Sequence, residues 1–312
     1  MRILLTGALG HIGSYLLHNL SSHLEVEEII ATDNLQSQRF SSLFNIKTQT
    51  TIKFYEEDTR NLTKEFLLSK GDIECIIHLS AMTDASSSID KRNELFQNNL
   101  ESTTNIASLA RDLQIPIIFP SSTSVYGSQE SLVDEENSVL NPQSPYAECK
   151  IAEEQIFTSR NFEKSKFAIL RFGTIHGTSP GMRFHTAVNK FCMQASLNQE
   201  ITVWKTALNQ KRPYLALNDA AGAIAHVINK KLWDGNIYNV VTENYTVQQV
   251  VDFIEKAQGV PCRIRLVDSP IMNQLSYEVA TEKFVKTGYI FAGSASQDIG
   301  STLQLLSGIR NS

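Results

Sequence analysis

The chain begins Met1-Arg2-Ile3-Leu4-Leu5-Thr6-Gly7-Ala8-Leu9-Gly10-His11-Ile12-Gly13, and this stretch decides the fold. The apolar run at residues 3–5 indicates a buried parallel strand. Three glycines follow at intervals of three, and residues 14–20 carry apolar side chains at helical spacing. The stretch therefore predicts a strand, a tight glycine turn and a helix.

Each glycine of this turn has a separate steric task in binding a dinucleotide. Gly7 lets the chain turn off the strand, Gly10 leaves room for a pyrophosphate, and Gly13 lets the helix pack against the sheet. The helix N-terminus offers free N–H groups to phosphate. The spacing is GxxGxxG, which differs from the GxGxxG found in many dehydrogenases. The alternative is a glycine-rich turn without a ligand, because short motifs also match by chance.

Length and composition describe an ordinary globular protein. The 312 residues suffice for one large domain or two modest ones. The 28 basic and 33 acidic residues give a formal charge of −5 without long runs of either sign, so we expect no nucleic-acid or membrane partner. No apolar run reaches the ~18 residues of a membrane-spanning helix. Since residues 1–5 already form the first strand, no signal peptide is predicted and we expect a cytoplasmic protein.

The four cysteines lie far apart at positions 75, 149, 192 and 262 and form no CxxC pair. This spacing predicts reduced thiols and no metal site.

Strands and helices alternate through the first half of the chain. Strands are predicted at residues 28–32, 52–55, 74–81, 116–119 and 166–171, and helices at 62–69, 91–112 and 151–160. This rhythm is typical of a Rossmann-type, doubly wound parallel sheet. We expect residues 1–172 to form an NAD-binding domain.

The alternation loosens after residue 173. We predict a loop over residues 173–181, helices at 186–197, 219–229 and from Thr246 to near Gly259, and a strand at 201–204. Residues 173–312 should form mainly a smaller, mixed α/β substrate-binding region, from which the chain can cross back to the first domain.

Ligands of such sheets bind at the carboxyl ends of the strands. The predicted ends include Asp33 and Asp58. Asp33 lies about 20 residues after the glycine turn, where a carboxylate binds both ribose hydroxyls and repels a 2′-phosphate. Asp33 therefore favours NAD over NADP, although the nearby Arg39 keeps NADP binding open. The alternative interpretation of Asp33 is an exposed carboxylate in a turn, without a role in binding.

Tyr146 and Lys150 are four residues apart at the start of a predicted helix, so their side chains share one face. A tyrosine ionises near pH ~10, and a nearby ammonium favours the phenolate. As an isolated pair they are more simply two neighbours on a helix surface.

Further motifs accompany this pair. The chain resembles the extended short-chain dehydrogenase/reductase family, and within it the NAD-dependent nucleotide-sugar epimerases and dehydratases. The matching segments are residues 7–13, Asp33-Asn34-Leu35, Asp58, His78-Leu79-Ser80-Ala81, Asn98-Asn99-Leu100, residues 121–127, residues 144–150 and Leu170-Arg171-Phe172. The resemblance implies bound NAD and a homodimer through helix 91–112 and the helix that starts near Tyr146.

The resemblance also implies roles for individual residues. Tyr146 is the general acid and base, Lys150 lowers its pKa and binds the nicotinamide ribose, and Ser122 bonds the reacting oxygen, with a strand-end turn serine as the alternative. The implied cofactor-binding residues are Gly7, Gly10, His11, Ile12, Gly13, Asp33, Asn34, Asp58, Thr59, Leu79, Ala81, Asn99, Tyr146 and Lys150. The implied substrate-binding residues are Thr83, Thr123, Thr174, Arg183 and Arg212, the last matching an arginine that binds the nucleotide diphosphate.

The implied reaction is epimerisation of a nucleotide-diphosphate sugar through a transient keto-sugar, with hydride transfer to and from NAD. The 4,6-dehydratases of the family carry an Asp-Glu pair where this chain has Thr123 and Ser124, so dehydration is disfavoured. Two features depart from the epimerases: Thr174 replaces an asparagine, and no second phosphate-binding arginine occurs at residues 273–277. The alternatives are an NAD(P)H-dependent keto-sugar reductase and a non-catalytic dinucleotide-sensing protein.

Overall fold

The computed structural model describes residues 1–83, 91–129, 132–136, 139–163, 165–268 and 277–308. Its largest element is a seven-stranded parallel sheet in the order β11-β7-β5-β4-β1-β2-β3. The strands are β1 (Arg2–Thr6), β2 (Glu28–Asp33), β3 (Thr51–Glu56), β4 (Cys75–His78), β5 (Ile117–Ser122), β7 (Phe167–Phe172) and β11 (Ile237–Val240). The order reverses between β1 and β4, where doubly wound sheets bind their ligands. The predicted fold class is confirmed.

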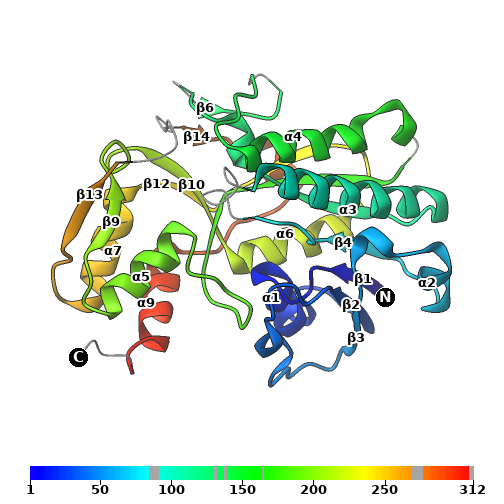
Figure 1. The fold of residues 1–312 in the computed structure, drawn as a ribbon, viewed down its shortest axis with the longest axis horizontal. Helices are drawn as coiled ribbons and strands as arrows, with labels where there is room; N and C mark the ends of the chain where they lie inside the picture. Colours follow the sequence, from blue (N-terminus) through cyan, green and yellow to red (C-terminus); the bar gives the residue numbers. More distant parts are fainter. Residues whose placement is uncertain (84–90, 130–131, 137–138, 164, 269–276, 309–312) are drawn as a thin grey trace.

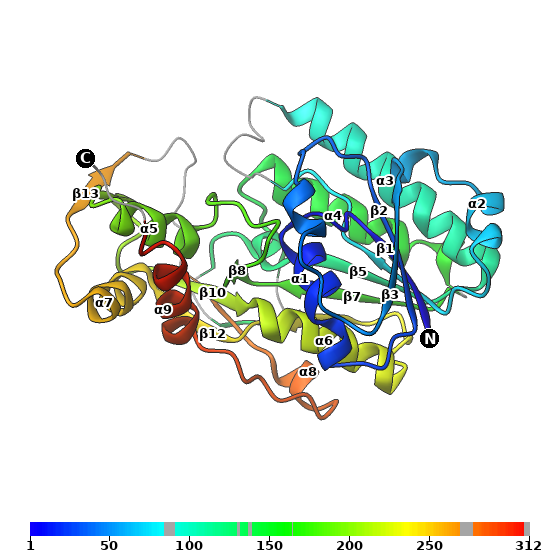
Figure 2. The same cartoon turned by 90° about the horizontal axis from the view of Figure 1, so that it is seen from below.

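Helices cover both faces of this sheet (Figures 1 and 2). One face carries α1 (His11–Asn19) and α6 (Leu217–Lys230), and the other carries α2 (Lys64–Ser69), α3 (Arg92–Leu113) and α4 (Pro145–Thr158). Alternate residues of β1 enter the two cores: Ile3 and Leu5 face α1 and α6, whereas Leu4 faces α3 and α4. Because both faces are buried in the middle of the sheet, inner strands such as β1 and β4 are short apolar runs, whereas the edge strand β3 is partly exposed.

A smaller lobe lies beyond the carboxyl ends of these strands, at the left of Figure 1. It contains a three-stranded sheet in the order β12-β10-β8, a pair β13-β9 and three helices. The elements are β8 (Thr174–His176), α5 (Ala187–Ser196), β9 (Ile201–Trp204), β10 (Lys211–Ala216), β12 (Glu243–Thr246), α7 (Val247–Gln258), β13 (Ile264–Val267) and α9 (Ala295–Leu305). Their core includes Phe191, Val250 and Ile254.

Shorter elements complete the described fold. β6 (Leu132–Val133) pairs with β14 (Glu278–Val279), and α8 (Glu282–Val285) packs beside β11. Short 3-10 turns are η1 (Leu20–Ser22), η2 (Phe40–Leu43), η3 (Thr59–Asn61), η4 (Thr123–Tyr126) and η5 (Arg160–Phe162). The chain crosses back to the main sheet in β11, which pairs with β7. A division at residue 172 stays a prediction.

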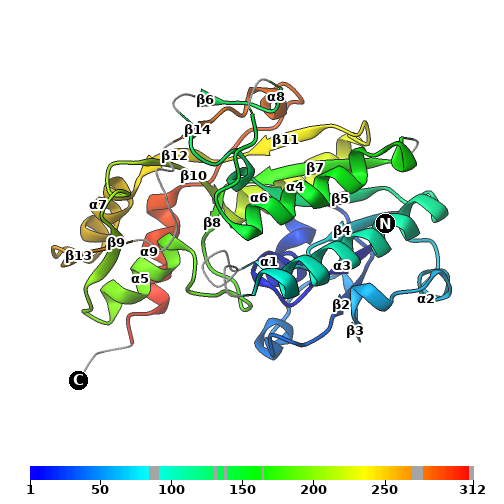
Figure 3. The same cartoon turned by 45° about the horizontal axis from the view of Figure 1, so that its top comes forward.

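The structure corrects several predicted elements. The predicted loop over residues 173–181 contains β8. The helical pattern of residues 151–160 belongs to α4, which begins at Pro145, close to the predicted start near Tyr146. β10 was not predicted because Pro213 interrupts its apolar pattern; pairing with β8 begins only at the next residue, Tyr214. Figure 3 shows α3 and α4 side by side on one face of the sheet. The homodimer through these helices stays a prediction.

Within the described part of the chain, no helix has the length and apolarity needed to cross a membrane.

Candidate active site

The glycine turn after β1 has the shape that a pyrophosphate requires. Gly7 has a φ of +64°, and a Cβ there would lie 2.6 Å from the Leu79 carbonyl carbon. A Cβ on Gly13 would lie 2.4 Å from the Gly7 oxygen, so α1 can approach the turn only with glycine here. Gly10 is the N-cap of α1 and has no side chain to cap the first N–H groups, which therefore stay available to phosphate. The turn fits NAD.

Asp33 ends β2 with its carboxylate fixed beside the glycine turn. One oxygen accepts a hydrogen bond from the Leu9 N–H at 3.0 Å, and the other accepts from the Leu35 N–H at 3.0 Å. The residue is 9% exposed, so it is not an exposed turn carboxylate. Its binding to ribose stays a prediction.

Asp58 lies at the end of β3, the next strand of the sheet. It accepts hydrogen bonds from the Arg60 guanidinium at 2.7 Å and from the Asn34 amide at 3.2 Å. The Arg60 guanidinium holds the pKa of Asp58 at about 2, so the carboxylate is ionised at neutral pH. The structure thus brings Asn34 and Asp58 together, as a shared cofactor role requires.

Hydrogen bonds from the Asn99 side-chain amide and between two hydroxyl groups hold the segment after β4 in place. Asn99 of α3 donates to the Met82 oxygen at 3.1 Å and accepts from the Met82 N–H at 2.8 Å. Thr59 and Ser80 share a hydroxyl hydrogen bond of 2.8 Å. Asn99 and Thr59 therefore fix the segment that follows β4, and their contact with the cofactor stays a prediction.

Ser122, Tyr146 and Lys150 meet where β5 ends and α4 begins. The Ser144 hydroxyl caps α4 by accepting from the Ala147 N–H at 3.2 Å, and Pro145 occupies the first helical position. This start places Tyr146 and Lys150 on successive turns facing β5. The Ser122 side chain lowers the pKa of the Tyr146 phenol, and the Lys150 Nζ lies 6.0 Å from the Tyr146 ring centroid.

Two opposing effects act on the Tyr146 phenol. Burial is the larger effect and raises its pKa above the usual value, because desolvation penalises the phenolate. Lys150 lowers the pKa of Tyr146, in the direction that the sequence predicted. Burial of its ammonium is the largest single effect on Lys150 and lowers its pKa, but the combined attraction of Glu153, Tyr146 and Cys149 raises the pKa above its usual value.

The candidate substrate residues fall into two groups. Arg183 donates a hydrogen bond to the Thr83 hydroxyl, which joins the smaller lobe to the segment after β4. Thr174 and Arg212 lie on the adjacent strands β8 and β10. The Arg212 guanidinium donates to the Gln210 amide oxygen at 3.2 Å, and burial lowers its pKa.

Thr123 belongs to neither group. It is 2% exposed, and its hydroxyl donates to the Phe172 carbonyl at 3.2 Å. The Thr123 hydroxyl thus donates its hydrogen to the carbonyl at the end of β7, and a contact with substrate stays a prediction.

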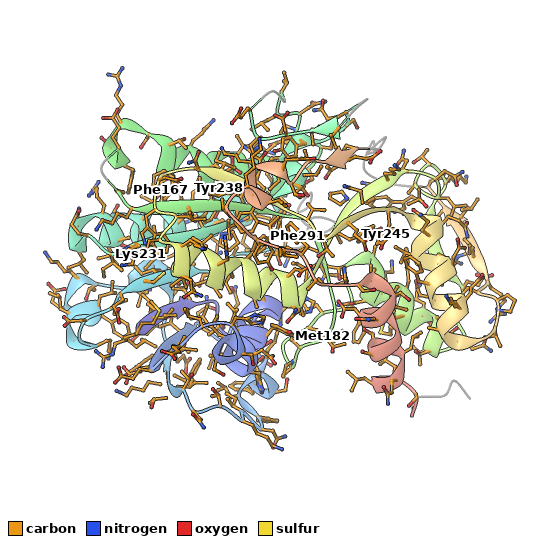
Figure 4. All side chains as sticks on the ribbon, turned by 180° about the vertical axis from the view of Figure 1, so that it is seen from behind. Phe167, Met182, Lys231, Tyr238, Tyr245 and Phe291 are labelled. Carbon is orange, nitrogen blue, oxygen red and sulfur yellow. The ribbon has the colours of Figure 1, made fainter. Side chains whose placement is uncertain are left out.

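Residues 177–183, here called the strap, lie against the glycine turn. The Ser179 hydroxyl donates to the His11 carbonyl at 2.8 Å, and the Gly181 N–H donates to the Ser14 hydroxyl at 2.9 Å. Burial lowers the pKa of His11 to about 4, so its ring is neutral when it bonds the Gly177 carbonyl at 3.0 Å. In Figure 4, Met182 of the strap is labelled between the N-terminal part of the chain and α9.

Arg39 and Gly181 form a further part of this contact. The Arg39 guanidinium donates to the Gly181 carbonyl at 2.9 Å, and burial lowers the Arg39 pKa to about 10. A Cβ on Gly181 would lie 2.2 Å from the Leu9 oxygen. No sequence motif indicated this contact, which joins residues more than 140 positions apart.

Comparison with known proteins identifies related sequences and folds. A profile of the NAD dependent epimerase/dehydratase family matches residues 3–240. UDP-glucose 4-epimerase of Bacillus subtilis is 25% identical over 86% of this chain and 85% of that protein. dTDP-D-glucose 4,6-dehydratase of Dictyostelium discoideum is 28% identical over 78% of this chain and 58% of that protein.

Among solved structures, UDP-glucose 4-epimerase of Bifidobacterium longum, in complex with NAD⁺ and UDP, has the same fold. It matches with a TM-score of 0.83 at 21% identity, over 99% of this chain and 98% of that one.

Proposed function

The chain belongs to the NAD-dependent epimerase/dehydratase family, and we propose that it is an NAD-dependent epimerase of nucleotide-diphosphate sugars. The glycine turn, Asp33 and Asp58 would hold the dinucleotide. Arg212 and Arg183 would meet the anionic nucleotide, because guanidinium groups suit phosphate.

In the proposed reaction Tyr146 takes the proton of a sugar hydroxyl while that carbon is oxidised to a ketone. Ser122 holds the reacting oxygen, and the Lys150 ammonium stabilises the phenolate form of Tyr146. When bound, NAD supplies the hydride acceptor and donor for this oxidation and re-reduction. Tyr146 returns the proton after the keto-sugar has turned over.

The strap is the observation that favours an epimerase over a reductase. A reductase must exchange its cofactor in every turnover, whereas an epimerase regenerates NAD in place. The strap contacts the glycine turn through Ser179, Gly181 and the Arg39 guanidinium. These bonds would have to break before a dinucleotide could leave, which supports a cofactor retained through many turnovers.

The strand end after β5 supports epimerisation over dehydration. Elimination of water needs an acid and a base beside the sugar, and Thr123 and Ser124 offer only hydroxyls there.

The proposal predicts that the purified protein retains NAD and interconverts sugar epimers without net change of the cofactor. Absorbance and mass spectrometry of the released cofactor test the first part. NMR of UDP-, dTDP-, GDP- and CDP-sugars incubated with the protein tests the second. Stoichiometric consumption of NAD(P)H would show a reductase, and a product that has lost water would show a dehydratase.

The substitution Gly181→Ala should speed the release of retained NAD by roughly tenfold or more, because its Cβ would displace the strap from the Leu9 carbonyl. Overpacking of this kind costs about 1–3 kcal/mol, and about 1.4 kcal/mol is a factor of ten. Release into excess buffer is followed by filtration and absorbance.

Gly300→Ala is the matched control, since a Cβ there has no neighbour within 4 Å among the described residues. Equal release rates in both variants would contradict a retaining role for the strap.

A further inference from the structure

A buried carboxylate lies next to the Tyr146–Lys150 pair. Glu153 is 0% exposed, and one of its oxygens lies 3.1 Å from the Lys150 Nζ. The ammonium also lies 3.4 Å from the Pro120 carbonyl and 4.6 Å from the ring centroid of Phe119. Lys150 is thus fixed between a carboxylate, a carbonyl and an aromatic face.

The other oxygen of Glu153 ends a chain of hydrogen bonds that starts on β1. The Thr6 hydroxyl lies 2.8 Å from His78 Nδ1, and His78 Nε2 lies 3.2 Å from the Thr103 hydroxyl. Thr103 donates to Glu153 at 2.7 Å. All four residues are buried, so no described surface group competes for these bonds.

The available hydrogen atoms decide which group donates in each of these hydrogen bonds. Thr103 has one hydroxyl hydrogen and donates it to Glu153, so His78 must donate from Nε2 and accept from Thr6 at Nδ1. Burial lowers the pKa of His78 to about 3, so the ring stays neutral and keeps this tautomer. Every donor therefore points toward Glu153, and such a chain stabilises an ionised carboxylate.

We propose that Glu153 is a positioning residue, which holds Lys150 in place as an ammonium ion and sets the pH range over which Tyr146 transfers protons. The proposal rests on the proposed function only in taking Tyr146 and Lys150 as the reacting pair. Without Glu153 the lysine would be a buried cation beside one carbonyl and an aromatic face, and burial disfavours its charge.

The negative charge of Glu153 determines in which direction the pKa values of Lys150 and Tyr146 change. A negative charge beside Lys150 stabilises the ammonium and raises the Lys150 pKa. The same charge repels the phenolate and raises the Tyr146 pKa. A neutral side chain at position 153 should therefore lower both values, and the two limbs of a bell-shaped pH profile should move together to lower pH.

Other ionisable groups face the pair from each neighbouring element. His78 of β4 is neutral, and burial raises the pKa of the Cys149 thiol on α4 to about 12. Arg92 of α3 is paired with Glu148 at a partly exposed site. Glu153 is thus the ionised side chain that contacts Lys150 within the described structure.

The test is Glu153→Gln, which keeps the shape of the side chain and removes its charge. The midpoints of the kcat/KM profile for sugar epimerisation should fall by about 1 pH unit or more, as for loss of a charge within about 4–6 Å. Tyrosinate absorbance, taken as the difference between each protein and its Tyr146→Phe form, should show the same fall of the Tyr146 midpoint without any substrate. This second readout separates the proposal from the proposed function: the absorbance shift stands even if no sugar is turned over.

Three further variants complete the experiment. Glu153→Asp retains the charge and should restore the midpoints. Glu148→Gln removes a charge from the same helix near the surface and should leave them in place. Glu153→Met, also neutral, repeats the test if the Gln variant does not fold. Unchanged midpoints in a folded neutral variant, with only a lower rate, would overturn the proposal, as would an equal shift in Glu148→Gln.

Discussion

Replacing Tyr146 by Phe should lower kcat for sugar epimerisation by about 10²–10⁴-fold, the range contributed by one general acid-base group. The ring would remain beside Lys150, while the phenol hydroxyl, whose pKa Ser122 and Lys150 lower, would be lost. Because the lost hydroxyl is the proposed proton carrier, the loss should appear in kcat more than in KM. NMR time courses on the substrate found in the sugar panel measure both constants.

Retained NAD and the melting temperature of Tyr146→Phe should match those of the unmodified protein, which shows that the loss is chemical. Tyr55→Phe is the control for removal of a phenol, because Tyr55 packs on Phe66 and Lys70, away from the triad. Unchanged turnover in Tyr146→Phe would contradict the catalytic assignment. If no substrate is turned over by either protein, the non-catalytic dinucleotide-sensing alternative gains support.

The sequence predicted the parts of the fold that local patterns control. Buried parallel strands are short apolar runs, and the doubly wound order follows once they alternate with helices. The glycine turn was readable because Gly7 and Gly13 meet steric limits within one strand-turn-helix unit. Asp33 could be placed because it ends the strand next to that turn in the sheet.

The contacts that distinguish this site depend on long-range pairing, which leaves little trace in one sequence. The strap reaches the glycine turn from more than 160 positions away through Ser179 and Gly181. Glu153 resembled any charged residue in a helix until the structure placed it beside Lys150. β11 was missed for a similar reason: four residues, 237–240, gain their burial only by pairing with β7.

The net pKa of Tyr146 could not be predicted either. The spacing of Tyr146 and Lys150 indicated an attractive charge, and that contribution is present. Desolvation depends on how many atoms surround the phenol, which only the packed structure shows.

The substitution Arg171→Met should lower the free energy of unfolding by about 3–5 kcal/mol, the cost of leaving a buried charge without its partner. Arg171 of β7 is 3% exposed and binds Glu154 of α4 with two parallel bonds, Nε to Oε1 at 2.9 Å and Nη2 to Oε2 at 2.7 Å. Its third bond goes to the Tyr126 hydroxyl at 2.9 Å. Urea unfolding at neutral pH, followed by circular dichroism, measures the loss.

The double variant Arg171→Met/Glu154→Leu separates the ion pair from simple packing. It removes both charges, so no uncompensated carboxylate remains, and more than half of the lost stability should return. Arg111→Met is the surface control, because its ion pair with Asp112 is solvent-exposed and contributes about 0–1 kcal/mol. A double variant less stable than Arg171→Met would contradict this prediction. The loss of stability would then come from the missing hydrogen bonds of the pair, and not from a buried carboxylate without its partner. Glu154 lies one turn after Lys150 on α4, and Arg171 lies on β7, so a stable double variant that has lost turnover would show that this ion pair fixes the helix that carries Tyr146 and Lys150.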